Sequence, residues 1–204
     1  VPMETRGLVA EWSSSTGEMT VWISTQSPPE ERGFCARLLG IDEHRVRVIA
    51  RDTGGGFGLK VAPLREETCI QLAARTLGTA VKWIEDRQEN LMSSGMARHE
   101  HAEVRMAFDA EGRILAAGMD HVQNVGAYPT PSPLTAGVVV GMLFPGPYRV
   151  PDASFSVKFH YSNTVGRLAY RGPWQFESVA REVLLDHAAR RIGIDPVELR
   201  RRNM

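Results

Sequence analysis

Four glycines fall within five residues in the segment Gly54–Gly58. A short apolar run at 45–50 precedes it and has the pattern of a buried strand, and a helical pattern opens at Pro63. A strand-to-helix connection without side chains lets backbone N–H groups approach an anionic ligand closely, and the following helix N-terminus adds partial positive charge. The segment therefore predicts a cradle for a negatively charged cofactor, with a tight turn that closes helix against strand as the alternative.

The common nucleotide-binding fingerprints do not fit this glycine loop. Counting from Gly54, the dinucleotide fingerprint needs glycine at the position where Leu59 stands. The P-loop needs Gly-Lys-Ser/Thr in direct succession, whereas Gly58 is followed by Leu59-Lys60-Val61. A nucleotide-binding protein is accordingly a distant alternative.

The charge balance excludes several classes of partner. Lys plus Arg and Asp plus Glu are 24 each, so the net charge is zero and predicts no attraction to nucleic acid or to an anionic membrane. No apolar run approaches the roughly 20 residues that span a bilayer, and no signal peptide is visible. We expect a cytoplasmic protein.

The two cysteines, Cys35 and Cys69, both fall in helical patterns, which predicts two buried thiols. An iron–sulfur cluster usually takes about four cysteine ligands, so any such cluster must lie on another chain.

Hydrophobic periodicity predicts a mixed α/β fold. The expected strands are 18–24, 45–50, 80–84, 103–108, 113–125 and 154–161, and the expected helices are 28–39, 64–77 and 175–192, with another beginning at 195–198. Residues 128–151, rich in Pro and Gly, resist placement. One region, 1–204, is expected, with a sub-boundary near 98–102.

Apolar spacing also predicts which helix faces are buried. In the helix 64–77, Cys69, Ala73 and Leu77 share one face. In the helix 175–192 an apolar stripe opposes a charged face. The stripe is Phe176, Val179, Ala180, Val183, Leu184, Ala188 and Ile192, and the charged face is Glu177, Arg181, Asp186 and Arg190.

Eight short phrases of sequence are spread from end to end of the chain. They are Pro2-Met3-Glu4, Ser24-Thr25-Gln26-Ser27-Pro28, Gly54-Gly55-Gly56-Phe57-Gly58-Leu59-Lys60, Val81-Lys82-Trp83-Ile84-Glu85-Asp86-Arg87, Gly126-Ala127-Tyr128, Gly146-Pro147-Tyr148, Ala169-Tyr170-Arg171-Gly172 and Asp195-Pro196-Val197-Glu198-Leu199-Arg200-Arg201-Arg202-Asn203. In this order they resemble the molybdopterin-binding large subunit of the xanthine dehydrogenase, aldehyde oxidase and carbon monoxide dehydrogenase family, the molybdenum hydroxylases. The resemblance implies that the chain is an internal piece of that subunit.

The resemblance implies a set of cofactors and partners. Molybdenum is held through the dithiolene of molybdopterin, in the cytosine dinucleotide form usual for bacteria, with no direct protein ligand. Iron–sulfur clusters and FAD belong to an iron–sulfur small subunit and an FAD-binding medium subunit. The reaction it implies is hydroxylation of a small molecule with oxygen from water.

The resemblance also implies roles for particular residues. Gln26 corresponds to a glutamine whose neutral amide lies beside the apical metal oxygen and can donate to that oxygen or to substrate. Arg171 corresponds to an arginine beside the cofactor, where a permanent positive charge stabilises anionic ligands. These two are the expected catalytic residues. The expected cofactor-binding residues are Gly55, Gly56, Phe57, Gly58, Arg171 and Gly172.

Three differences from members of this family reduce the number of substrate classes that the resemblance allows. Purine-oxidising members carry glutamate two positions after the equivalent of Leu59, where this chain has Val61, and a second substrate arginine would fall within 136–141, which reads Ala-Gly-Val-Val-Val-Gly. Copper-containing carbon monoxide oxidisers carry cysteine where this chain has Gly172. These differences leave an aldehyde or N-heteroaromatic substrate, for which Trp174 is either a pocket wall or a core residue.

The family's general base is a glutamate in a later domain, beyond residue 204. We therefore expect the 204-residue chain alone to be inactive. The alternative is a stand-alone α/β ligand-binding or interaction module without redox activity.

Overall fold

The computed structural model describes residues 1–129, 131–172 and 175–204, with 131–136 described by their backbone alone. The chain divides into two compact units. Val1–Gly95 with Leu168–Arg171 form the first, and Met96–Arg167 with Gly172–Met204 form the second. Within the described part of the chain, no helix combines the length and the apolar character needed to cross a membrane.

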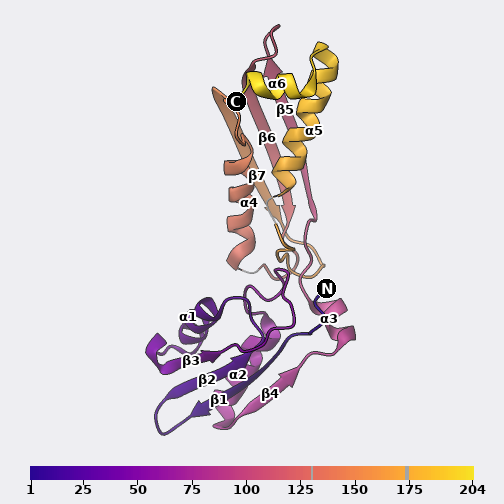
Figure 1. Ribbon diagram of the computed structural model, residues 1–204. Coiled ribbons are helices and arrows are strands. Elements are labelled where there is room, and N and C mark those ends of the chain that lie inside the picture. Colours follow the sequence, from indigo (N-terminus) through magenta and orange to yellow (C-terminus); the bar gives the residue numbers. More distant parts are fainter. Residues whose placement is uncertain (130, 173–174) are drawn as a thin grey trace. The chain divides into compact units, whose positions relative to one another are not determined.

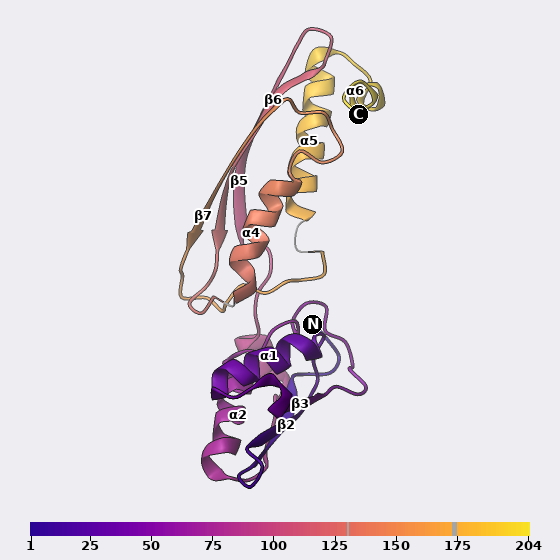
Figure 2. The same cartoon turned by 90° about the vertical axis from the view of Figure 1, so that its left-hand side faces the viewer.

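The first unit is a four-stranded sheet in the order β3-β2-β1-β4 with two helices packed on one face (Figures 1 and 2). Strand β1 is antiparallel to β2 and β4, and β2 is parallel to β3. The elements are β1 (Gly7–Ser13), β2 (Glu18–Ile23), α1 (Pro28–Leu39), η1 (Glu43–Arg45), β3 (Val46–Ile49), α2 (Arg65–Leu77), β4 (Val81–Ile84) and α3 (Arg87–Ser93).

Alternation along the strands places the core of the first unit between sheet and helices. Leu8 and Ala10 of β1 and Met19 and Val21 of β2 are buried against α1 and α2, together with Cys35. Helix α1 begins with proline in its first turn and ends at Gly40, which adopts a left-handed conformation. Strands and helices of this unit confirm the predicted α/β class.

The buried face of α2 differs from the predicted one. Cys69 is exposed and Leu77 is 68% exposed, so the prediction of two buried thiols is wrong for Cys69. The face that packs inward carries Glu67 and Gln71 instead. These polar groups are buried because each has a partner: Glu67 lies 3.8 Å from Arg6, and Gln71 donates to Glu31 at 2.6 Å.

The second unit is a three-stranded sheet in the order β5-β6-β7, in which β5 and β6 form the predicted hairpin and β7 pairs parallel to β6. Helices α4 and α5 cover one face of it (Figure 2). The elements are β5 (Glu100–Phe108), β6 (Ile114–Asn124), α4 (Pro131–Leu143), β7 (Asp152–His160), α5 (Gln175–Ile192) and α6 (Pro196–Arg202). Helix α4 occupies the stretch that the sequence pattern left unplaced.

The inward face of α5 is also not the predicted stripe. Val179 and Val183 are 63% and 51% exposed, whereas Glu177 and Arg181 are buried. Arg181 lies inside because its guanidinium donates to the carbonyl oxygens of Leu143 at 3.2 Å and of Phe144 at 3.1 Å. These carbonyls lie at the C-terminal end of α4, where backbone acceptors lack helical partners. A buried cation thus caps a neighbouring helix.

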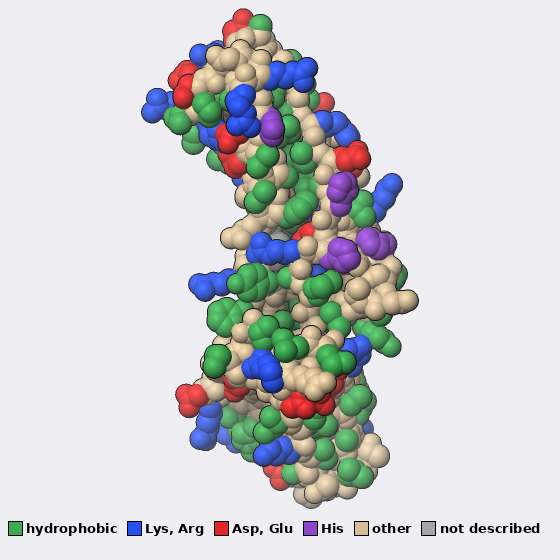
Figure 3. Space-filling model, turned by 90° about the vertical axis from the view of Figure 1, so that its right-hand side faces the viewer, with side chains coloured by type: hydrophobic (Ala, Val, Ile, Leu, Met, Phe, Trp, Pro, Cys, Tyr) green, Lys and Arg blue, Asp and Glu red, His purple; other side chains and the backbone are tan. Residues whose placement is uncertain are grey.

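The surface is mixed in charge. On the face drawn in Figure 3, basic and acidic side chains are interspersed, as expected for a chain with zero net charge.

Candidate functional site

The glycine loop follows β3 directly, as predicted, but its relation to the next helix differs from the expectation. Helix α2 begins only at Arg65, and its first turn is occupied by its own acid, because Leu64 N–H donates to Glu67 Oε2 at 2.6 Å. Glu66 and Glu67 in the first turn of α2 therefore already offset the positive charge at its N-terminus. Any donors offered by the loop are those of the loop backbone itself.

Gln26 lies between β2 and α1 and is hydrogen-bonded to the loop by both its main chain and its side chain. Its Oε1 accepts from the N–H of Gly58 at 2.8 Å and from that of Lys60 at 3.3 Å, and its own N–H donates to the Lys60 carbonyl at 2.9 Å. Two backbone donors identify the bonded end of the amide as the oxygen. Among the described residues no acceptor is bonded to Nε2, so the donor end of Gln26 is available to a ligand.

The loop glycines allow this close approach. A Cβ at Gly56 would collide with the side-chain amide of Gln26, and one at Gly58 would collide with the carbonyl of Ala169. Gly58 also has φ of +98°, a conformation that disfavours other residues. The loop therefore packs against two segments far from it in sequence only because these positions lack side chains.

Arg171 is brought to the same place by the main chain. Its N–H donates to the carbonyl oxygen of Phe57 at 2.9 Å, and the segment Leu168–Arg171 belongs to the first unit. Gln26, the glycine loop and Arg171 are thus neighbours, and the Arg171 side chain is exposed. Gly172 belongs to the second unit, where it has φ of +72° and its carbonyl accepts from Gln175 N–H at 3.3 Å.

Phe57 combines exposure with an uncommon backbone conformation. Its φ is +53°, in the left-handed region that bulky residues seldom adopt, and it is 44% exposed. Such conformations persist where the surrounding structure holds them, and they are frequent at ligand-binding sites. In the part of the chain that the structure describes, the N–H groups of Gly55, Gly56 and Phe57 have no acceptor. These N–H groups and Nε2 of Gln26 are uncharged donors, the kind that suits an electron-rich ligand.

An ionic network around the buried Lys60 ammonium supports the loop, and the sequence analysis assigned it no role. Lys60 Nζ lies 2.7 Å from Glu4 Oε2 and donates to Ser24 Oγ at 2.8 Å. Glu4 Oε2 also accepts from Ser24 Oγ at 2.5 Å and from Gly54 N–H at 2.7 Å. Partial burial favours a higher pKa for Glu4, but the hydrogen bonds from Lys60, Ser24 and Gly54 outweigh it and lower the pKa. The signal available in the sequence was that Glu4, Ser24 and Lys60 each lie within one of the eight phrases.

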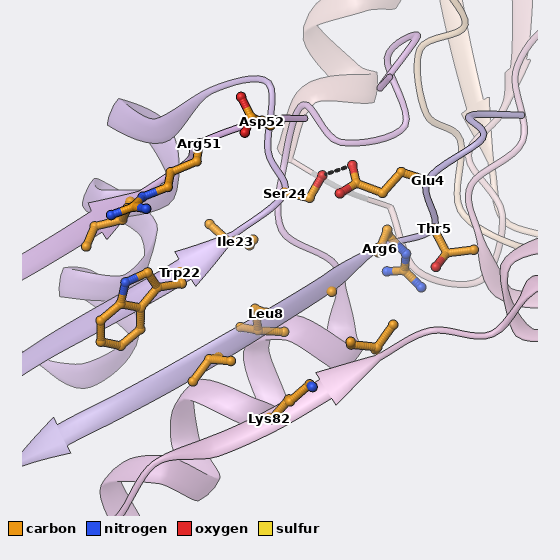
Figure 4. Close-up of a pocket in the computed structure, with 14 residues that line it drawn as sticks. Glu4, Thr5, Arg6, Leu8, Trp22, Ile23, Ser24, Arg51, Asp52 and Lys82 are labelled. Atoms are coloured by element: carbon orange, nitrogen blue, oxygen red, sulfur yellow. Dashed lines mark hydrogen bonds between the residues drawn. The ribbon is translucent and has the colours of Figure 1, made fainter. Parts of the chain in front are cut away.

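A hollow of about 320 Å³ opens on the sheet of the first unit (Figure 4). Its lining includes Trp22 and Lys82, and Glu4, Ser24 and Asp52 also border it. Neither Gln26 nor the glycines of the loop line it, so it is distinct from the site described above.

Trp174, for which the sequence left a pocket wall and a core position open, lies outside the described residues. Within the described ranges, no group of three or more His, Cys, Asp or Glu side chains is arranged to hold a metal ion.

The sequence matches known proteins along its whole length. The molybdopterin cofactor-binding domain model matches residues 1–204. The nicotine 6-hydroxylase large subunit of Paenarthrobacter nicotinovorans is 37% identical over 208 residues, covering all of this chain and 25% of that protein. The carbon monoxide dehydrogenase large chain of Hydrogenophaga pseudoflava is 34% identical, covering 99% of this chain and 26% of that protein.

The fold also matches that of a solved structure. Quinoline 2-oxidoreductase from Pseudomonas putida 86 matches with a TM-score of 0.88 and 39% identity, over all of this chain and 26% of that one. The chain therefore spans about a quarter of the length of these relatives.

Proposed function

Since the chain belongs to the molybdopterin cofactor-binding domain family, we propose that residues 1–204 are one cofactor-binding region of the catalytic large subunit of a molybdenum hydroxylase. The observation that carries this proposal is the convergence of Gln26, the glycine loop and Arg171 within the first unit. A module without a cofactor has no need for these three features at one place.

The residues present fit the cofactor. The N–H groups of Gly55, Gly56 and Phe57 would donate to the electron-rich dithiolene and metal centre, which the close approach of a loop without Cβ atoms permits. Nε2 of Gln26 would donate to an oxygen on the metal or to substrate, since Oε1 is already engaged by the loop. Arg171 would stabilise anionic charge, and Gly58 would keep the loop close to the group.

When bound, the cofactor supplies the oxidation of an electron-poor carbon with oxygen from water. The chain itself binds and orients it. Neutral donors and one arginine favour accumulation of negative charge at the centre without adding a proton-transfer group, which agrees with a general base on a later domain. The chain alone is accordingly expected to be inactive.

We propose an aldehyde or N-heteroaromatic compound as substrate. Val61 and the apolar stretch 136–141 leave no charged group for purine recognition at those positions, and Gly172 provides no thiolate for copper. Two of the relatives are named for nicotine and quinoline, which supports the N-heteroaromatic choice.

The remaining parts of the proposal concern the assembly. We propose the cytosine dinucleotide form of molybdopterin, an iron–sulfur small subunit, an FAD-binding medium subunit and a cytoplasmic location. The description of relatives as a large subunit or a large chain supports a complex of several chains.

The test compares the chain alone with the full-length complex. The complex should contain about one molybdenum and one pterin per large subunit and reduce a dye with an aldehyde or N-heteroaromatic compound, while the 204-residue chain should show no turnover. A complex without molybdenum, or one in which Gln26→Ala retains full turnover per metal, would contradict the proposal. It would favour the stand-alone α/β ligand-binding or interaction module.

A further inference from the structure

The two ends of the glycine loop are held by two different side chains. Glu4 holds the first end, because its N–H donates to the Gly54 carbonyl at 3.3 Å and its Oε2 accepts from the Gly54 N–H at 2.7 Å. Gln26 holds the second end through the N–H groups of Gly58 and Lys60. Neither contact alone determines the distance between the ends.

Lys60 joins these two anchors. Its main chain is bonded to Gln26 on both sides, since its N–H donates to Oε1 and its carbonyl accepts the Gln26 N–H at 2.9 Å. Its ammonium reaches Glu4 at 2.7 Å and Ser24 at 2.8 Å. The Lys60 side chain is 1% exposed, whereas that of Glu4 is 38% exposed. One buried residue thus connects both ends of the loop, and Ser24 completes the connection (Figure 4 shows its bond to Glu4).

The pairing also determines what kind of effect Lys60 can have. A buried ammonium in contact with a carboxylate contributes little net charge to its surroundings, so its effect on an anionic ligand is not chiefly electrostatic. What the pair supplies is geometry, and binding groups that are held in place before the ligand arrives bind it more tightly and more specifically.

We propose that Lys60 is a positioning residue: with Glu4 and Ser24 it closes the glycine loop and holds the Gln26 amide and the loop N–H groups in one arrangement. The part of this inference that concerns the cofactor rests on the proposed function. The part that concerns the loop does not.

The experiment uses the full-length complex carrying this chain, with Lys60→Met, Glu4→Gln, the double variant, and Lys82→Met as a matched control. Lys82 is an exposed lysine of the same unit, on β4. Hydrogen exchange of the hydrogen-bonded amides of Gly54, Gly58 and Lys60 is the first measurement. We expect exchange at least about tenfold faster in each single variant, no faster in the double variant than in the faster single one, and unchanged in the control.

The second measurement is kcat per bound molybdenum together with the electron paramagnetic resonance spectrum of the metal centre. Each single variant should lower kcat per metal at least about fivefold, leave KM within about twofold, and alter the spectrum. A merely structural role would reduce metal content and melting temperature while leaving kcat per metal and the spectrum unchanged, and that result would overturn the proposal.

Further results would also decide whether Lys60 is a positioning residue. Unchanged loop exchange in both single variants, or losses that multiply in the double variant, would overturn the proposal, and if Lys60→Met does not fold, Glu4→Gln decides alone. A wild-type complex without molybdenum would refute the proposed function, while loop exchange would still decide the positioning role.

Discussion

Oε1 of Gln26 accepts the N–H of Gly58 at 2.8 Å. This bond removes the usual difficulty with a glutamine at a binding site, whose oxygen and nitrogen are interchangeable without partners. Because the loop takes the oxygen, the nitrogen is the end left for a ligand. The orientation is built into the protein and does not depend on what binds.

Exchanging Gln26 for Glu separates support of the loop from donation to the ligand. Gln26→Glu keeps an oxygen for the Gly58 N–H but removes the donor and adds negative charge. Turnover of the full complex should fall by about 10² or more, as for loss of one oriented donor, while the melting temperature stays near that of wild type. Steady-state kinetics per bound metal and thermal unfolding measure both effects. A variant that keeps its turnover would contradict a donor role for Gln26.

Replacing Gly58 tests the requirement for a bare backbone in the loop. Gly58→Ala places a Cβ against the Ala169 carbonyl at a φ of +98°, whereas Gly40→Ala also puts alanine at a positive φ, of +64°, but with no atom within 4 Å of its Cβ. We expect the control to lose about 1 kcal/mol of unfolding free energy and Gly58→Ala at least about 2 kcal/mol more. Urea unfolding of the two variants gives the comparison, and equal losses would show that the loop can move away from Ala169.

Glu31 makes stability depend on pH. Burial and the charge of Glu67 raise the pKa of Glu31 from 4.5 to about 7, although the hydrogen bond from Gln71 lowers it. The folded state therefore holds this proton more tightly than the unfolded state. The stability that Glu31 contributes is complete below pH 4.5 and is lost as the pH rises through 7.

Glu31→Gln removes this dependence. Its gain in unfolding free energy over wild type should be larger at pH 8 than at pH 4.5 by a few kcal/mol. Each tenfold increase in the proton affinity of the carboxylate on folding corresponds to about 1.4 kcal/mol. Glu30→Gln, at an exposed neighbour in the same turn, is the control and should leave the pH profile as in wild type. Denaturant titrations from pH 4.5 to 8 measure it. Parallel profiles for Glu31→Gln and wild type would refute the assignment.

Arg181 should contribute to the stability of the second unit, although the sequence pattern predicted that its side of α5 is exposed. Arg181→Met removes the donor to the Phe144 carbonyl and one of the two donors to the Leu143 carbonyl, which also accepts the Gly146 N–H at 2.9 Å. It also leaves the buried carboxylate of Glu177 without its cation at 3.7 Å, and we expect a loss of about 2 to 4 kcal/mol. Arg190→Met, at an exposed position of the same helix, should change stability by less than about 0.5 kcal/mol. Thermal unfolding distinguishes them, and similar melting temperatures would show that Arg181 does not cap α4.

Local pattern was sufficient for most elements. Alternation predicted the hairpin of β5 and β6, and the proline and glycine around α1 predicted both of its ends. The family resemblance carried by the eight phrases is confirmed by the match over residues 1–204. The stretch 128–151 resisted because its prolines and glycines suggest loops, although part of it forms α4, which packs against β6, β7 and α5.

The buried faces of the helices and the side chains that support the glycine loop could be identified only in the folded structure. Cys69 and Val179 belong to apolar stripes but are exposed, whereas Glu67 and Arg181 are buried. Hydrophobic periodicity assigns charged residues to the exposed face of a helix. It contains no information about a partner from a distant part of the sequence that would stabilise such a residue when buried. The same holds for Lys60, whose partner Glu4 becomes its neighbour only on folding.

The amino-acid sequence by itself determined the α/β class, the family and the identity of Gln26, the glycine loop and Arg171 as the residues of interest, because these depend on residue type and order. Only the tertiary structure decided which end of the Gln26 amide is available, which charges are buried, and that Lys60 connects the two ends of the loop. The physical reason is that hydrogen bonds and ion pairs between distant segments depend on distance and burial, which local sequence does not encode.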